Sequence, residues 1–272
     1  MEKVSDVHFQ ISEESTIPYN AAIDINAKID INGTRDGKYF FGEASGLKTP
    51  TRYYYRAVAI IDWKEYYGSI KSFTTDWEAI DMGIVVGGKK IKWAPCNIGA
   101  AKEDKYGDSF AWGEEELKTD YSWSTYTYGK SPSGAFSKYN TVSSYGTVDN
   151  KTVLDPEDDV AHVKWGGKWR MPTDAEWTAL REQCTWTEIT RNGINGRLVI
   201  AHNGNSIFLP AAGYGSGTKI GKYAGSNGYY WSSSLNPSDP FDAYGVLFDS
   251  GGVQRFSYFR YFGLSVRPVC EE

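Results

Sequence analysis

The residue types that most often carry catalysis are few and scattered in this chain. Its three histidines are His8, His162 and His202, and no Gly-x-Ser-x-Gly motif supplies a serine nucleophile. The glycine-rich stretch from Gly217 to Tyr223 is one residue too short to be a phosphate-binding loop, and Tyr223 occupies the position at which such a loop needs Ser or Thr. The sequence therefore predicts neither a catalytic triad nor a phosphate loop.

A short acidic cluster could bind a metal. Asp155, Glu157, Asp158 and Asp159 offer the oxygen ligands that calcium prefers. Acidic residues are also favoured in the first turn of a helix, because the helix dipole attracts negative charge there. We expect a helix that begins at Asp155 and runs to about Lys164, with a calcium site as the alternative and no other cofactor.

The three cysteines are Cys96, Cys184 and Cys270, and they show neither zinc-site spacing nor a Cys-x-x-Cys pair. From their number alone, one disulfide with a remaining thiol and three buried thiols both stay open.

Charge and hydropathy exclude two classes of partner. A net charge of -5 argues against binding to nucleic-acid phosphates and to anionic membrane surfaces. No apolar run approaches the ~20 residues of a membrane helix, and because the first six residues contain no hydrophobic segment we expect no signal peptide in this chain. We therefore expect neither a nucleic-acid partner nor direct membrane insertion.

The 10 Trp, 20 Tyr, 12 Phe and 29 Gly indicate short strands joined by many turns. Residues 1–76 contain segments in which apolar and polar side chains alternate, and they predict an all-β unit. A linker follows at 76–83, and residues 80–272 form a second domain with a long irregular insertion at 118–150.

The second domain has one clear helix start. Thr173 and Glu176 have capping-box spacing, and Trp177, Leu180 and Cys184 then share one helical face. Short strands are expected at 197–201, 206–209, 229–233, 243–249, 253–258 and 265–269.

Two sets of motifs resemble known families. Within residues 40–75, Gly-Leu-x-x-x-Thr-x-Tyr-Tyr-x-Arg-Ala followed by Tyr-Gly-x-x-x-x-Phe-Thr-Thr resembles the last two strands of a fibronectin type III or immunoglobulin-like sandwich, which is short here and implies a spacer without a site. Residues 84–270 resemble the C-type lectin-like fold, in the branch that holds formylglycine-generating enzymes and bacterial surface proteins. The motifs that carry this likeness are Lys-Trp-Ala-Pro-Cys-Asn-Ile-Gly-Ala at 92–100, Tyr-Gly-Asp-Ser-Phe-Ala-Trp-Gly-Glu at 106–114, Trp-Gly-Gly-Lys-Trp-Arg-Met-Pro-Thr-Asp-Ala-Glu-Trp at 165–177, Ile-Phe-Leu-Pro-Ala-Ala-Gly-Tyr at 207–214, Gly-Tyr-Tyr-Trp-Ser-Ser-Ser at 228–234 and Gly-Leu-Ser-Val-Arg-Pro-Val at 263–269.

The lectin-like resemblance implies an α+β domain with two helices and short antiparallel strands, preceded by the all-β sandwich module. It also implies a Cys184–Cys270 disulfide, which leaves Cys96 alone. Because the oxidases of this branch hold copper with a cysteine pair, the resemblance favours a non-enzymatic protein at the cell surface. An oxidase relative, or a structural adhesin or pilus-associated module, is the alternative.

The stretch 256–262 is too aromatic for a simple alternating strand, and an aromatic β-core is the competing interpretation. We expect a surface that binds a protein or glycan on a cell surface. Its expected ligand-binding residues are Phe241, Asp242, Tyr244, Arg255, Phe256, Ser257, Tyr258, Phe259 and Phe262. This layout is similar to lectin-like proteins that are diversified by retroelements, which change adenines in Asn codons. Arg255 aside, the expected binding residues, together with Gly245 and Asp249, have codons that one or two changes in an Asn codon would produce.

Overall fold

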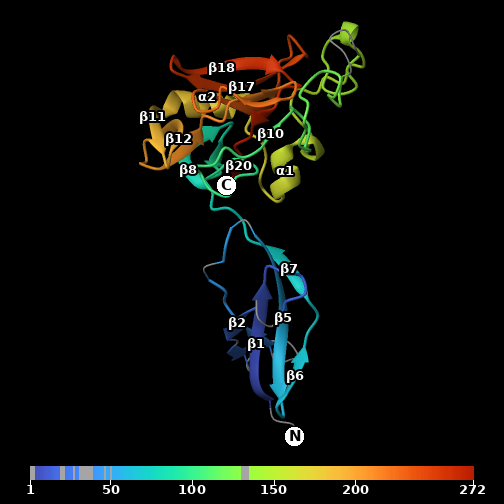
Figure 1. Cartoon of the computed structure of the whole chain (residues 1–272), viewed down its shortest axis with the longest axis vertical. Coiled ribbons are helices and arrows are strands. Elements are labelled where there is room, and N and C mark those ends of the chain that lie inside the picture. Colours follow the sequence, from blue (N-terminus) through green and yellow to red (C-terminus); the bar gives the residue numbers. More distant parts are fainter. Residues whose placement is uncertain are drawn as a thin grey trace. The chain divides into compact units, whose positions relative to one another are not determined.

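The computed structural model describes residues 4–18, 22–26, 28–30, 39–45, 47–49, 51–129 and 135–272. The chain divides into unit 1 (Met1–Trp77) and unit 2 (Glu78–Glu272), and each is described by itself (Figure 1). The division falls inside the linker expected at 76–83. No helix among the described residues is long and apolar enough to span a membrane.

Unit 1 is built from strands. They are β1 (Val4–Ser12), β2 (Ile23–Asn26), β3 (Lys28–Asp30), β4 (Tyr39–Phe41), β5 (Arg52–Ile61), β6 (Lys64–Tyr67) and β7 (Lys71–Thr74). One sheet has the order β2-β1-β5-β6, with β7 also paired to β5, and β3 pairs with β4. The alternation in β1 and β5 sets their register, because Phe9 opposite Ala57 and Ile11 opposite Tyr55 gather apolar side chains on one face.

Unit 2 contains thirteen strands and two α-helices among its described residues. The strands are β8 (Ile80–Val86), β9 (Lys89–Trp93), β10 (Ser109–Phe110), β11 (Thr185–Arg191), β12 (Ile194–Ile200), β13 (Ser206–Pro210), β14 (Tyr214–Ser216), β15 (Lys219–Lys222), β16 (Gly228–Leu235), β17 (Asp242–Asp249), β18 (Gly252–Phe259), β19 (Leu264–Ser265) and β20 (Val269–Glu271). The helices are α1 (Val160–Trp165) and α2 (Asp174–Gln183), with 3-10 turns at Ser143–Tyr145 and Pro156–Asp158. The largest sheet has the order β10-β19-β16-β17-β18.

The expected α+β class is wrong, because 44% of the residues lie in strands and only 9% in helices, so the chain is β-rich. The physical reason is length. Helix α1 has six residues and α2 has ten, and most other core residues lie in strands or in irregular segments. The strand expected at 265–269 is also two short strands, β19 and β20, because Pro268 has no N–H for a ladder.

The capping box at the start of α2 is confirmed. Thr173 Oγ1 accepts from the Glu176 N–H at 3.3 Å, and the Thr173 N–H donates to Glu176 Oε2 at 2.7 Å. The helix then buries Trp177 between Trp93 and Tyr230, with ring centroids 4.6 and 5.8 Å away. Helix α2 is thereby fixed against β9 and β16, directly behind the sheet that carries the expected binding residues.

Helix α1 begins later than expected. Residues Pro156–Asp158 form a 3-10 turn, and Asp159 is the N-cap of the α-helix. Its carboxylate accepts from the N–H groups of Ala161 at 2.9 Å and His162 at 3.2 Å through one oxygen, and from Met171 N–H at 2.8 Å through the other. The expected start at Asp155 is therefore wrong by one turn. The helix begins after Asp159 because the carboxylate of Asp159 accepts hydrogen bonds from N–H groups of the first turn, which have no partner within the helix.

Candidate binding surface

The pleat of the sheet separates the expected ligand-binding residues onto two faces. Ala243 pairs with Tyr258 and Tyr244 with Ser257, without a bulge between β17 and β18. Since alternate side chains point to opposite faces, Phe256 and Tyr258 lie on one face, while Tyr244, Arg255, Ser257, Asp242 and Phe259 start from the other. The structure therefore does not bring all nine residues together on a single surface.

Aromatic rings cover the face of Phe256 and Tyr258. Tyr258 lies 5.4 Å from Phe256, 4.8 Å from Phe262 and 5.6 Å from Tyr214, centroid to centroid. Tyr229 of β16 lies 5.9 Å from Phe256. Phe256, Tyr258 and Phe262 are half-buried, so these rings pack on one another and still present part of their area to solvent.

The same ring network extends to more exposed side chains. Tyr223 is 55% exposed and lies 6.0 Å from Tyr214. Phe259 is 43% exposed, stacks on Tyr261 at 5.7 Å and reaches Trp123 at 6.1 Å. We call six of the partly exposed rings of this network the aromatic surface. Its members are Trp123, Tyr223, Tyr258, Phe259, Tyr261 and Phe262.

The sequence did not indicate Trp123, Tyr223 or Tyr261 as part of this surface. Trp123 comes from the irregular segment and Tyr223 from the turn after β15, both remote in sequence from β18. The pairing of Tyr121 with Gly217 and the long antiparallel β17–β18 ladder bring these segments together. Aromatic composition was the only sequence signal for them.

The side chain of Phe241 packs against other aromatic rings of unit 2. Its ring lies 4.9 Å from Phe136, 4.9 Å from Tyr145 and 5.5 Å from Trp123. It therefore anchors the irregular segment against the start of β17.

The polar residues of the opposite face are engaged with partners in their own unit. Arg255 Nε donates to Asp174 Oδ1 at 2.7 Å, and its guanidinium lies 3.6 Å from the Tyr244 ring centroid. Ser257 Oγ donates to Asp242 Oδ2 at 2.9 Å, while burial raises the pKa of Asp242. The Arg255 contact joins β18 to the start of α2, and the Ser257 contact joins β18 to β17.

Gly245 cannot be a freely varied position. A Cβ added there would lie 2.3 Å from the backbone oxygen of Tyr230, closer than any side chain tolerates. Diversification would therefore have to act on the exposed members of the set, such as Phe259.

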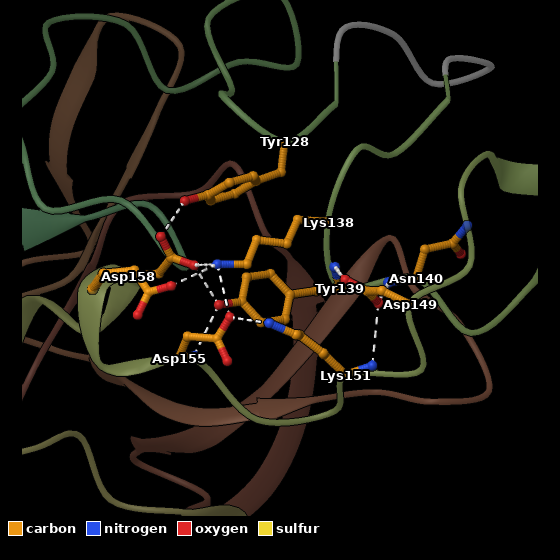
Figure 2. Close-up of polar contacts among 9 residues, drawn as sticks. Tyr128, Lys138, Tyr139, Asn140, Asp149, Lys151, Asp155 and Asp158 are labelled. Carbon is orange, nitrogen blue, oxygen red and sulfur yellow. Dashed lines mark hydrogen bonds and ion pairs between the residues drawn. The ribbon is translucent and has the colours of Figure 1, made fainter.

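The acidic cluster surrounds a lysine (Figure 2). Carboxylate oxygens of Asp155, Glu157 and Asp158 lie within 4.8 Å of one another. Lys138 Nζ is 2.8 Å from Asp155 Oδ2 and 3.5 Å from Glu157 Oε1, and it also pairs with Asp158. Because Lys138 supplies the positive charge at the centre, these residues do not fit a calcium site.

Tyrosine hydroxyls complete this network. Tyr128 donates to Asp158 Oδ1 at 2.6 Å and Tyr139 donates to Asp158 Oδ2, while Lys151 pairs with Asp155. Burial alone would raise the pKa of Asp158, but the hydrogen bonds from Lys138, Tyr128 and Tyr139 lower it overall. The hydrogen bond from Lys138 likewise lowers the pKa of Asp155. The network ties the irregular segment to the turn before α1.

The expected Cys184–Cys270 disulfide is wrong, since none of the three cysteines is in a disulfide. Cys184 is the C-cap of α2, which packs on β8, whereas Cys270 lies in β20 at the opposite edge of the sheet β20-β9-β8. Burial raises the pKa of the Cys96 thiol to about 11, and its Sγ donates to the Ala100 carbonyl at 3.2 Å. Burial also raises the pKa of Cys184, so both thiols are protonated at neutral pH and lack the character of reactive cysteines.

Comparison with known proteins gives one match. A family model described as a domain of unknown function (DUF8237) matches residues 185–269. This range runs from β11 to the first residue of β20 and includes β17 and β18 with most of the aromatic surface. No curated protein and no solved structure matches the chain.

Proposed function

We propose that unit 2 is a non-enzymatic binding domain that recognises a protein or glycan partner through the aromatic surface. The observation that carries this proposal is a network of partly exposed rings that runs from Trp123 through Phe259 and Phe262 to Tyr258, and that the buried ring of Tyr214 links to the exposed Tyr223. A soluble protein ordinarily buries so many rings, and a large exposed apolar patch marks an interaction site.

The rigidity of the support favours recognition. Tyr214 and Tyr229 are only 6% exposed, and Trp231 is fully buried beneath Phe256 with its Nε1–H donating to the Phe110 carbonyl at 2.9 Å. Rings held in this way offer contact area without losing side-chain freedom on binding. Lys222, whose Nζ lies 5.7 Å from the Tyr223 centroid, adds a positive charge at one end.

The proposal includes the resemblances given by the motifs. Unit 2 would have a C-type lectin-like fold, unit 1 would be a fibronectin type III or immunoglobulin-like spacer, and the protein would act outside the cell or at its surface. The exposed rings could be diversified by a retroelement. A near-copy of the coding segment beside the gene, differing only at adenines, is the finding that would support that origin.

The test is a binding screen of the whole chain on glycan and bacterial-surface protein arrays. We expect the double variant Tyr223→Ala and Phe259→Ala to lose at least roughly tenfold in affinity for any partner found, because a few aromatic residues usually supply most of the binding energy of an interface. Both side chains are exposed, so the variant keeps its fold.

Leu117→Ala is the matched control, since Leu117 is 57% exposed in unit 2 and outside the aromatic surface. Binding that survives the double variant, or that Leu117→Ala weakens equally, would refute the proposed surface.

A further inference from the structure

Strand β18 is the outer strand of the largest sheet in unit 2 (Figure 1). It pairs with β17 from Asp249 opposite Gly252 to Asp242 opposite Phe259, and the register has no bulge. At ~3.4 Å per residue its eight residues present a regular edge about 27 Å long.

The backbone groups of this edge are open. Arg260 N–H donates to the Phe241 carbonyl at 3.0 Å, which identifies these two residues as a hydrogen-bonded pair of the β17–β18 ladder. Because such pairs alternate along antiparallel strands, Val253, Arg255 and Ser257 direct their N–H and C=O groups away from β17. Within the described ranges, no other backbone group bonds to those of these three residues.

The edge also lacks the features that usually prevent strand pairing. Proteins protect edge strands with Lys, Pro, bulges or a covering segment. Strand β18 contains no Lys or Pro, and Arg255 is its one charged residue. That charge is drawn back onto its own unit by Asp174 and the Tyr244 ring, so it leaves the edge accessible.

We infer that β18 pairs antiparallel with β18 of a second copy of this chain. This inference does not depend on the proposed binding function. In an antiparallel pair, directly opposite residues point to the same face of the sheet. When the two strands are identical and related by a two-fold axis, this requires one residue to lie opposite its own copy, at the axis. An axis at Arg255 would place two guanidinium groups opposite each other, which is unfavourable.

An axis at Phe256 removes that conflict and matches apolar side chains. It overlaps the strands over residues 253–259 and pairs Phe256 with itself, Arg255 with Ser257, Val253 with Phe259 and Gln254 with Tyr258 of the second copy. Arg255 and Ser257 both face the open edge, so their backbone groups meet in register. The pair uses the free edge of both copies and therefore closes as a dimer instead of growing into a filament.

The test is sedimentation velocity of the whole chain over a broad concentration series, comparing Ser257→Pro with Ser257→Ala. Both variants lose the hydroxyl bond to Asp242. Proline also removes the outward N–H but leaves the β17 ladder intact. We expect Ser257→Pro to weaken dimerisation at least roughly tenfold relative to Ser257→Ala, because each copy loses one N–H and the dimer therefore loses two hydrogen bonds between the copies.

A second measurement needs no variant. Hydrogen exchange of the unmodified chain should show the amides of Val253, Arg255 and Ser257 becoming protected as concentration rises. A chain that stays monomeric at every concentration, equal dimerisation by the two Ser257 variants, or concentration-independent exchange of these amides would each overturn the inference.

Discussion

Two buried arginines show how unit 2 holds charge in its interior. Arg267 is fully buried and donates from Nε to Asn97 Oδ1 at 2.9 Å and to the carbonyls of Ala94 at 3.1 Å and Phe208 at 2.8 Å. Burial lowers its pKa, while these oxygens satisfy the guanidinium. Arg260 instead lies 4.0 Å from the Phe136 ring and joins the end of β18 to the irregular segment.

We predict that Arg267→Lys lowers the free energy of unfolding of unit 2 by about 2–4 kcal/mol. A lysine has a single nitrogen and cannot reach oxygens that lie around a planar guanidinium, so buried acceptors are left unpaired. Urea denaturation followed by tryptophan fluorescence measures the change.

Arg181→Lys is the control, because Arg181 forms a surface pair with the exposed Glu182. We expect less than about 0.5 kcal/mol for that change. Similar losses for the two variants would contradict the role of Arg267 as a fixed centre of the fold.

At the scale of elements, the sequence predicts local signals well and spatial pairing poorly. The Thr173–Glu176 spacing correctly indicates the start of α2, because a capping box depends on four consecutive residues. At the acidic cluster the helix begins one turn later than expected, and the sequence does not show the partner Lys138, because it lies in the irregular segment and no local pattern joins the two. Alternation along β18 implies that Tyr258 and Ser257 point to opposite faces, whereas the expected binding surface placed both of them on one side.

The network around Lys138 should make the stability of unit 2 depend on acid. The folded-state pKa of Asp158 is lowered, so its stabilising effect is present above the unfolded value near 3.9 and is lost as pH falls through the folded value. We predict that thermal melts between pH 7 and pH 2 show a steeper acid loss for the unmodified chain than for Asp158→Asn.

Glu182→Gln serves as the control for that series, because its carboxylate makes an exposed ion pair only. Addition of calcium should leave the melting temperature of the unmodified chain unchanged, as Lys138 holds the centre of the cluster. A calcium-dependent rise, or equal acid sensitivity in both variants, would contradict this interpretation.

At the scale of the whole molecule, the two units differ in how much core they contain. Among the residues of unit 1 whose burial the structure describes, the buried apolar side chains are Ile11, Ile17, Tyr53 and Val58. Unit 2 has extended clusters around Trp93 and Trp231. Since small domains bury a smaller fraction of their surface, unit 1 has less to offset the entropy of folding.

We therefore predict two calorimetric transitions, with unit 1 melting first. Val58→Ala removes buried methyl groups from unit 1 and should destabilise it by about 2 kcal/mol, lowering the first transition alone. Val199→Ala, at a fully buried position in unit 2, should lower the second transition alone. A single transition that both variants shift equally would mean that the two units unfold together. If Val199→Ala lowered the first of two transitions, unit 2 and not unit 1 would melt first.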